Sequence, residues 1–100
     1  MKLAWTFRAR QDLIDIGRFI ARDHPRAARM FLKRLRSRAR SAVRFPLSGR
    51  LVSEFRRHDL REVLEGNYRI VYQVAEKRIV ILTVFEGHRL FPPDVVPEAR

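Results

Sequence analysis

Two apolar-rich runs in the second half of the chain constrain its fold more than any other feature. Residues 60–72 read LREVLEGNYRIVY, and residues 79–91 read IVILTVFEGHRLF after a short turn. Alternating apolar and polar residues, followed by an almost continuous apolar stretch, predict three strands. These predicted strands are Asp59–Leu64, Tyr68–Val74 and Arg78–Phe85. Glu65-Gly66-Asn67 and Ala75-Glu76-Lys77 have the composition of tight turns, so we expect an antiparallel β-meander.

The first half of the chain has a different period. Lys2–Phe7 alternates weakly and is predicted to form a first strand, after which apolar residues recur every three to four positions, as in a helix. Thr6 can cap this helix, which should end near His24-Pro25 because the residue before a proline is disfavoured in helical conformation. The apolar face of this helix is predicted to hold Leu13, Ile16, Phe19 and Ile20.

A second helix is predicted to begin at Pro25, since proline suits the first turn of a helix. Its apolar stripe consists of Ala28, Phe31, Leu35, Ala39 and Ala42. Pro46 and Ser48-Gly49 should end it, and two helices with so short a connection form an antiparallel hairpin. Residues 1–100 are therefore expected to form a single α+β domain of order β-α-α-β-β-β, with the hairpin on one face of an antiparallel sheet.

The position of several side chains follows from this arrangement. Four aromatic residues are predicted to pack in the core under the helices: Trp5, Phe7, Tyr68 and Tyr72. The arginines of the strands are expected on the opposite, concave face of the sheet. The tail from Pro92 onward is rich in proline and is predicted to be irregular. Phe91, just before it, either covers the edge of the sheet or stands exposed as a contact residue.

Charge is distributed very unevenly along the chain. Residues 1–50 contain 14 Lys/Arg and 3 Asp/Glu, whereas residues 51–100 contain 8 of each kind. No acidic residue lies between Asp23 and Glu54, although nine basic residues do. Such a block predicts an acidic partner, which could be nucleic acid, a membrane surface or an acidic protein segment, because like charges this dense repel when nothing binds them. The alternative is that these helices are simply well solvated.

Composition disfavours several classes of protein. The chain contains no cysteine, which excludes disulfides and thiolate chemistry. No apolar run approaches the ~18–20 residues that span a bilayer, and the N-terminus lacks the apolar stretch of a secretion signal. We therefore expect a soluble, cytoplasmic protein without a membrane partner. Because His24, His58 and His88 are scattered, and nucleophile motifs and phosphate-binding glycine loops are missing, no metal or cofactor is expected.

Charged residues at strand positions offer the remaining chemistry. These residues are Arg61, Glu62, Arg69, His88 and Arg89. If they converge on one face of the sheet, the arginines can hold a phosphodiester, and Glu62 or His88 can act as a general base. Alternatively, Arg61 and Arg69 form salt bridges across strands with Glu62, Glu54 or Glu86, an ordinary way to place charge on a sheet. The carboxylate of Glu62, between the arginines, favours the second interpretation.

These features, in this order, resemble the RelE/ParE superfamily of bacterial toxins from toxin–antitoxin pairs. The segment ARQDLIDIGRFIARDHPRAARMFLKRL resembles the first helix, the proline and the second helix of the superfamily, and FPLSGRLV resembles its Pro-x-x-Gly-Arg turn. LREV, YRIVY and VFEGHRL resemble its strand signatures. The resemblance covers nearly the whole chain, and its most specific part is YRIVY with an Arg-Glu before it and a Gly-x-Arg after it.

The strand before YRIVY distinguishes two branches of the superfamily. RelE-like members, which cut mRNA on the ribosome, carry basic residues there and usually a tyrosine in the C-terminal tail. This chain has Leu60 and Glu62 in that strand instead, and no tyrosine follows Tyr72. The Arg-Glu pair resembles ParE-like members, which inhibit DNA gyrase and lack the nuclease residues. The usual His-Gly-Arg-Arg end of the last strand is replaced by Glu86-Gly87-His88-Arg89.

The resemblance therefore implies a ParE-like toxin that binds DNA gyrase, has no catalytic residue and is neutralised by a ParD-like antitoxin with an acidic C-terminal segment. One alternative is a RelE-like endonuclease that cuts mRNA on the ribosome, and another is a non-toxic binding module of the same fold. The catalytic candidates of the nuclease alternative are Arg61, Arg69, His88 and Arg89. The target-binding candidates are Arg61, Arg69, His88, Arg89 and Phe91. The antitoxin-binding candidates are Arg18, Arg22, Arg29, Lys33, Arg36 and Arg40.

Overall fold

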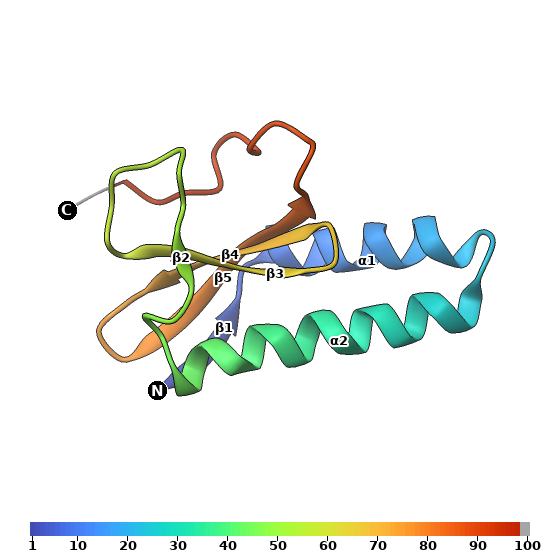
Figure 1. Ribbon diagram of the computed structural model, residues 1–100, viewed down its shortest axis with the longest axis horizontal. Helices are drawn as coiled ribbons and strands as arrows, with labels where there is room; N and C mark the ends of the chain where they lie inside the picture. The colour runs from blue at the N-terminus through green and yellow to red at the C-terminus, as the bar shows by residue number, and fades with distance from the viewer. Residues whose placement is uncertain (99–100) are drawn as a thin grey trace.

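One face of a five-stranded sheet carries a hairpin of two helices, as Figure 1 shows for the computed structural model, which describes residues 1–98. The helices are α1 (Phe7–Ala21) and α2 (Pro25–Arg44). The strands are β1 (Lys2–Trp5), β2 (Arg50–Leu51), β3 (Leu60–Glu65), β4 (Tyr68–Val74) and β5 (Arg78–Glu86). Across the sheet the strand order is β1-β5-β4-β3-β2. This α+β arrangement confirms the predicted order of elements.

The sheet is mixed rather than purely antiparallel. Strands β3, β4 and β5 form the predicted antiparallel meander. Strand β1, however, pairs with β5 in parallel, from Lys2 opposite Arg78 to Trp5 opposite Ile81. Strand β2 was not predicted, because two residues are too short to show a period; it pairs antiparallel with β3 and forms one edge of the sheet.

Local sequence sets the starts of both helices. Thr6 Oγ1 accepts a hydrogen bond from the backbone N–H of Ala9 at 3.0 Å, and the same hydroxyl donates to the carbonyl of Leu82 at 3.1 Å. The cap therefore also fastens the start of α1 to β5. Pro25 occupies the first turn of α2, where a backbone N–H has no partner within the helix, so the missing N–H of proline costs nothing. The predicted cap and the predicted break between the helices are both confirmed.

The main core lies between the helices and the sheet. Leu35 of α2 and Ile70 and Tyr72 of β4 are completely buried there. The two helices approach closely at Gly17, because a Cβ at that position would lie only 2.8 Å from Leu32 Cδ1. Trp5 and Tyr68 pack against the same core, as predicted.

Two predicted core aromatics are not in the core. Phe7 is 76% exposed and Phe19 is 65% exposed. Phe7 is the first residue of α1 rather than the last residue of a strand, so it does not follow the alternation of β1. Phe19 is one position before Ile20, and the rotation of about 100° per residue in a helix turns its side chain away from the face that Leu13 and Ile20 present to the core.

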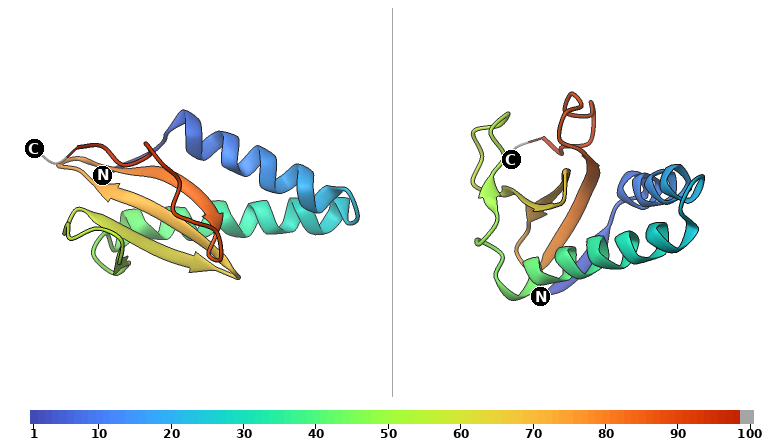
Figure 2. Two further views of the ribbon diagram at one scale, coloured as in Figure 1. Left: turned by 90° about the horizontal axis from the view of Figure 1, so that it is seen from above. Right: turned by 45° about the vertical axis from the view of Figure 1, so that its right-hand side comes forward.

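The second face of the sheet is covered by irregular chain and is not open. Figure 2 shows the segment between β2 and β3 and the tail after β5 on the side opposite the helices. A second apolar cluster lies under them, built on Val52, Leu60, Val71, Leu82 and Phe85, with Phe55, Phe91 and Val96 packed against it. The strand arginines were expected on this face: Arg69 does lie on it, but under the loop and tail. Phe91 covers the sheet, with its ring centroid 5.4 Å from that of Phe85.

A bulge in β5 joins α1 to the sheet. The register between β4 and β5 shifts at Val71/Tyr72, whose partners are Thr83 and Ile81, so that Leu82 is the extra residue of β5. Asp12 Oδ2 of α1 accepts hydrogen bonds from Thr83 Oγ1 at 2.6 Å and from the backbone N–H of Val84 at 2.9 Å. One helical carboxylate thus satisfies the donors at the bulge and fixes the position of α1 over the sheet.

Candidate functional site

Arg69 of β4 is the centre of the cluster of charged residues on the second face of the sheet. Its side chain is almost buried, and carboxylates occupy its guanidinium on both sides. Arg69 Nε donates to Glu62 Oε1 at 2.7 Å. The two terminal nitrogens donate to the two oxygens of Glu54, Nη1 to Oε2 at 2.8 Å and Nη2 to Oε1 at 2.7 Å. This bidentate geometry is the strongest form of ion pair between side chains.

Glu62 of β3 is itself shared between two arginines. Its side chain is 2% exposed, and its second oxygen, Oε2, accepts a hydrogen bond from Arg50 Nε at 2.5 Å. The pairing of Arg50 opposite Glu62 across β2 and β3 places this bond. Arg50, Glu54, Glu62 and Arg69, which we call the charge cluster, therefore combine two positive and two negative charges and sum to zero.

Aromatic rings complete the surroundings of Arg69. The guanidinium carbon lies 5.0 Å from the ring centroid of Phe85 and 5.5 Å from that of Phe91. Both distances lie within the range of cation–π attraction. The rings exclude water from one side of the guanidinium, which strengthens its ion pairs with the carboxylates.

The ion pairs shift the pKa values of both partners. The hydrogen bonds from Arg69 lower the pKa of Glu54 to about 2. The hydrogen bonds that Arg69 donates to Glu54 and Glu62 raise its own pKa above the ordinary arginine value. Arg69 and Glu54 thus stabilise the charged forms of each other, and both stay ionised at neutral pH. An incoming phosphate would have to displace Glu54 before it could bind Arg69.

Arg61 does not join this cluster. Arg61 pairs opposite Tyr72, whose side chain is in the core under the helices, while its neighbour Glu62 points to the other face. The Arg61 guanidinium donates to backbone carbonyls, at 3.1 Å to that of His58 and at 3.2 Å to that of Gly49. The predicted convergence of Arg61 with Arg69 on one face is therefore wrong, because successive strand residues alternate between faces.

His88 and Arg89 lie in the turn after β5. Both are exposed, and His88 Nδ1 is 2.6 Å from Glu86 Oε1. His88 lines a hollow of about 270 Å³ together with Arg50, Asn67 and Arg69. The structure thus brings His88 next to Arg69. Glu62 is not placed to act as a general base, since it is buried and both of its oxygens accept hydrogen bonds from arginines.

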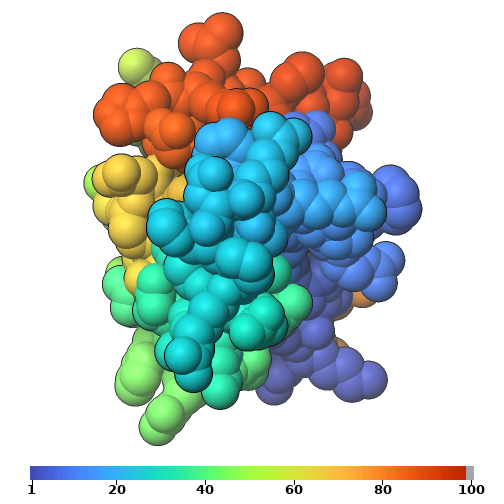
Figure 3. Space-filling view, turned by 90° about the vertical axis from the view of Figure 1, so that its right-hand side faces the viewer, coloured from blue at the N-terminus to red at the C-terminus, as the bar shows by residue number. Residues whose placement is uncertain are grey.

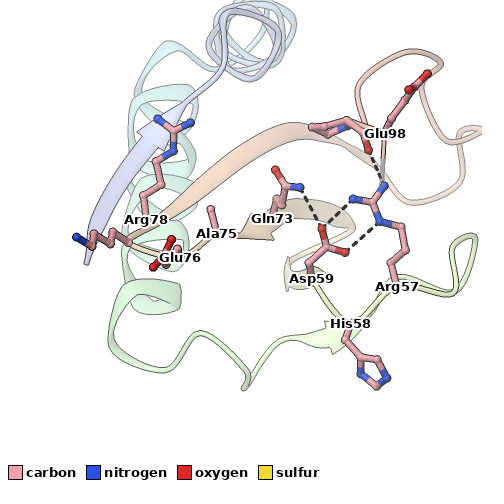
Figure 4. A pocket seen from close by; sticks show the side chains of 10 residues that line it. Arg57, His58, Asp59, Gln73, Ala75, Glu76, Arg78 and Glu98 are labelled. Atoms are coloured by element: carbon pink, nitrogen blue, oxygen red, sulfur yellow. Dashed lines mark hydrogen bonds and ion pairs between the residues drawn. The ribbon is translucent and has the colours of Figure 1, made fainter. Parts of the chain in front are cut away.

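A larger hollow, of about 900 Å³, lies at the other end of the sheet (Figure 4). Figure 4 shows Arg57, Asp59 and Gln73 pointing toward one another there. Arg57 donates to both carboxylate oxygens of Asp59, at 3.0 and 2.8 Å, and to the carbonyl of Pro97, so it also fastens the tail. The Arg57 hydrogen bonds lower the pKa of Asp59. The polar side chains of this hollow, Arg57, Asp59 and Gln73, bind one another, and we assign them a structural role.

The helical hairpin presents a row of cations. Six basic residues of α2 recur every three or four positions and are exposed: Arg26, Arg29, Lys33, Arg36, Arg40 and Arg44. We call these six residues the cationic row. Within residues 1–98, no member of the row forms an ion pair, whereas Arg34 on another side of α2 lies 3.8 Å from Glu65 and Arg38 donates to the carbonyl of Leu64. Arg18 and Arg22 of the neighbouring helix are also exposed.

All six candidate antitoxin-binding residues are therefore solvent-exposed on the hairpin. Figure 3 looks onto its end, where the last part of α1 and the first part of α2 form the surface nearest the viewer. No helix in the described part of the chain is long and apolar enough to cross a membrane. Within residues 1–98, His, Asp and Glu side chains do not gather in a group of three that could hold a metal ion.

Comparisons with known proteins agree with the fold and with the sequence motifs. The family model described as the ParE toxin of the type II toxin-antitoxin system parDE matches residues 3–91. Y4kP of Sinorhizobium fredii is 31% identical over 93 residues, which cover 91% of this chain and 93% of that protein. Toxin RelE2 of Caulobacter vibrioides is 34% identical over 90 residues, covering 89% of this chain and 98% of that protein. The fold is similar to that of a chain from the chromosomal ParDE system of P. aeruginosa, with a TM-score of 0.72 and 19% identity over 86% of this chain and 95% of that one.

Proposed function

This chain belongs to the ParE toxin family of type II toxin–antitoxin systems, and we propose that it acts by binding and inhibiting DNA gyrase without cutting nucleic acid. The observation that carries this proposal is the state of Arg69. A ribonuclease of this fold would need a cation free to stabilise charge that develops on the phosphodiester. In this chain all three guanidinium nitrogens of Arg69 donate to Glu54 or Glu62.

Two further observations support a non-catalytic toxin. The first is that Arg61, the candidate arginine of β3, points to the face that the helices cover and binds backbone carbonyls there. The second is that the face around Arg69 is packed with apolar residues of the protein's own loop and tail, including Phe55 and Phe91. RNA would find little open surface there. His88 and Arg89, which are exposed, remain the candidate target contacts on this side of the molecule.

The cationic hairpin supports a second part of the proposal, a cognate antitoxin with an acidic segment. Six exposed cations lie along α2, and Arg18 and Arg22 extend the positive surface onto α1. A disordered acidic segment would gain charge pairing and apolar burial as it orders on this surface. The P. aeruginosa chain of similar fold comes from a ParDE toxin–antitoxin system.

A ribosome-dependent mRNA endonuclease is the second candidate. It is favoured by the position of His88, which shares a hollow with Arg69 and could act as a general base if Glu54 swung away. The similarity to a relative named Toxin RelE2 points in the same direction. Catalysis by His88 and Arg69 would require a rearrangement of the charge cluster, which is why we place gyrase inhibition first.

Expression of the chain in growing cells separates the two candidates. We expect plasmid DNA to lose negative supercoiling soon after induction, while the rate of protein synthesis falls only later. Co-expression of the antitoxin should restore both, and a chain with a disrupted core serves as the negative control. Protein synthesis that stops before supercoiling changes would favour the endonuclease. Growth and supercoiling that both stay unchanged would favour a binding module without toxicity.

A further inference from the structure

The segment between α2 and β2 exposes three large apolar side chains. Phe45 is 63% exposed, Leu47 is 66% exposed and Leu51 is 47% exposed. Single exposed apolar residues are common on protein surfaces and need no explanation. Other large apolar side chains are also exposed, among them Phe7, Phe19 and Leu90. The three of this segment, however, lie within seven residues and form a candidate interaction surface. We call these three residues the apolar patch.

The segment that carries the patch is held rigidly. The buried hydroxyl of Tyr72 donates to the carbonyl of Pro46 at 2.8 Å. Arg61 Nη1 donates to the carbonyls of Leu47 and Gly49, at 3.4 and 3.2 Å. Gly49 fits tightly, since a Cβ there would overlap the Tyr72 hydroxyl and lie 2.9 Å from the carbonyl of Glu62. Two side chains thus fix the backbone of a segment whose own apolar side chains point to solvent.

The patch lies on one side of the molecule. Leu51 pairs opposite Arg61, so both side chains lie on the helix-bearing side of the sheet. The Arg61 guanidinium also binds the carbonyl of Leu47, which places the backbone of Leu47 at the same edge of the sheet. Phe45 follows directly after α2, with the Arg44 guanidinium 6.0 Å from its ring centroid.

The rim of the patch is cationic. Arg44 belongs to the cationic row, and Arg40 precedes it by one helical turn. The nearest carboxylates in the sequence do not offset these charges, because Glu54 and Glu62 are bound to Arg69 on the opposite face of the sheet. The patch therefore continues the cationic row at the C-terminal end of α2.

We propose that the apolar patch anchors apolar side chains of the same acidic antitoxin segment that binds the cationic row. This inference rests on the proposed function, and it names where the segment's apolar residues go. The 20 residues of α2 span about 30 Å at ~1.5 Å per residue. The segment thus places carboxylates along α2 and buries two or three apolar residues against Phe45, Leu47 and Leu51.

Two other occupants fit the patch less well. A second copy of the chain, related by a two-fold axis, would bring Arg44 and its neighbours against the same cations, and like charges at an interface are repulsive. Nucleic acid would pair with the cationic row and could stack a base on Phe45, but Leu47 and Leu51 offer it no stacking surface. An acidic segment with apolar anchors satisfies both parts of the surface.

The test uses the full-length cognate antitoxin that the proposed function requires, and it compares the dissociation of this antitoxin from two matched variants. One variant carries Phe45→Ser and Leu47→Ser, in the patch. The control carries Phe7→Ser and Leu90→Ser, which remove two side chains that are 76% and 93% exposed elsewhere on the molecule. We expect the patch variant to dissociate at least about ten-fold faster, as for loss of apolar anchors, with little change in association rate. The control should dissociate like the unmodified chain.

Three further readouts keep this inference distinct from the gyrase proposal. The melting temperature of the patch variant should equal that of the control, and the antitoxin-free patch variant should still inhibit gyrase. Unchanged dissociation would overturn the inference, and so would loss of gyrase inhibition with antitoxin binding intact, or a dimer of the unmodified chain that the patch variant abolishes. If the patch variant loses antitoxin but the unmodified chain never inhibits gyrase, the gyrase proposal fails and this inference stands.

Discussion

Glu54 binds Arg69 through both of its carboxylate oxygens, at 2.8 and 2.7 Å, although the two residues are 15 positions apart and Glu54 lies in an irregular segment. This ion pair joins the segment between β2 and β3 to β4 and covers a guanidinium that the fold would otherwise direct toward the hollow beside His88. One carboxylate from a loop thus decides what kind of chemistry the second face of the sheet can support.

The Glu54 ion pair predicts how stability depends on pH. The folded-state pKa of Glu54, about 2, is below its ordinary value of 4.5, so the unfolded chain binds more protons than the folded chain between these values. The contribution of this ion pair to the free energy of unfolding should therefore be complete above pH 4.5 and should decrease as the pH falls toward 2. Between about pH 2 and pH 6, the melting temperature of Glu54→Gln should depend less on pH than that of the unmodified chain. Parallel curves for the two proteins would show that the ion pair does not stabilise the fold.

Glu62 should be more costly to remove than a carboxylate at the surface. Truncation of Glu62 to Ala leaves Arg69 without one partner at a nearly buried site, and loss of one member of a buried pair costs about 3–5 kcal/mol. Glu65→Ala is the matched control, because the exposed Arg34 lies 3.8 Å away and such pairs contribute ~0–1 kcal/mol. Urea unfolding measures both changes. Equal losses for the two variants would contradict the central position of Glu62.

The packing of α2 predicts a second difference in stability. Leu35 is completely buried between the hairpin and the sheet, so Leu35→Ala should lower the free energy of unfolding by about 2–5 kcal/mol. Leu90→Ala removes the same atoms from a side chain that is 93% exposed and should have almost no effect. Thermal or urea unfolding of the two variants gives the comparison. A Leu35→Ala protein as stable as the Leu90→Ala protein would mean that the helix phase is wrong.

The cationic row predicts a salt-dependent association rate with the antitoxin. Reversal of charge at Arg36 and Arg40 to Glu should slow association strongly at low ionic strength and flatten its dependence on salt, since exposed charges mainly steer encounter. Arg78→Glu, an exposed change in β5 away from the hairpin, is the control. Association rates measured at salt concentrations from about 50 mM to about 500 mM test this prediction. Identical salt dependence for all three proteins would exclude an electrostatic role for the row.

Much of the fold could be predicted from local patterns. The strands of the meander, the cap at Thr6 and the break at Pro25 all depend on residues close together in sequence, which is why periodicity and turn chemistry found them. The parallel direction of β1 depends on where the chain returns after two helices, and no local pattern encodes it. The exposure of Phe7 depended on whether it belonged to the strand or to the helix, a boundary one residue wide.

The charge cluster was only partly predictable. A pairing of Arg69 with Glu62 or Glu54 was among the alternatives, because oppositely charged residues on neighbouring strands commonly pair. Arg50 was missed, since its strand is two residues long. The separation of Arg61 from Arg69 had a signal in the sequence: Arg61 and Glu62 are adjacent in one strand and must point to opposite faces. Applied to the strand register, that rule places Glu62 with Arg69 and Arg61 away from both.

The most direct test of this account is an assay of the purified, antitoxin-free chain on ribosomes that hold a defined mRNA, run beside gyrase supercoiling of plasmid DNA with the same preparation. The account predicts that supercoiling is inhibited in proportion to the chain added, while the mRNA stays intact. It also predicts that Arg69→Ala weakens inhibition only as far as it weakens folding. The contradicting result is cleavage of the mRNA in the ribosomal A site that Arg69→Ala abolishes in a protein that still folds. It would show that Arg69 acts in catalysis although it is bound to Glu54 and Glu62, and that the chain is a nuclease.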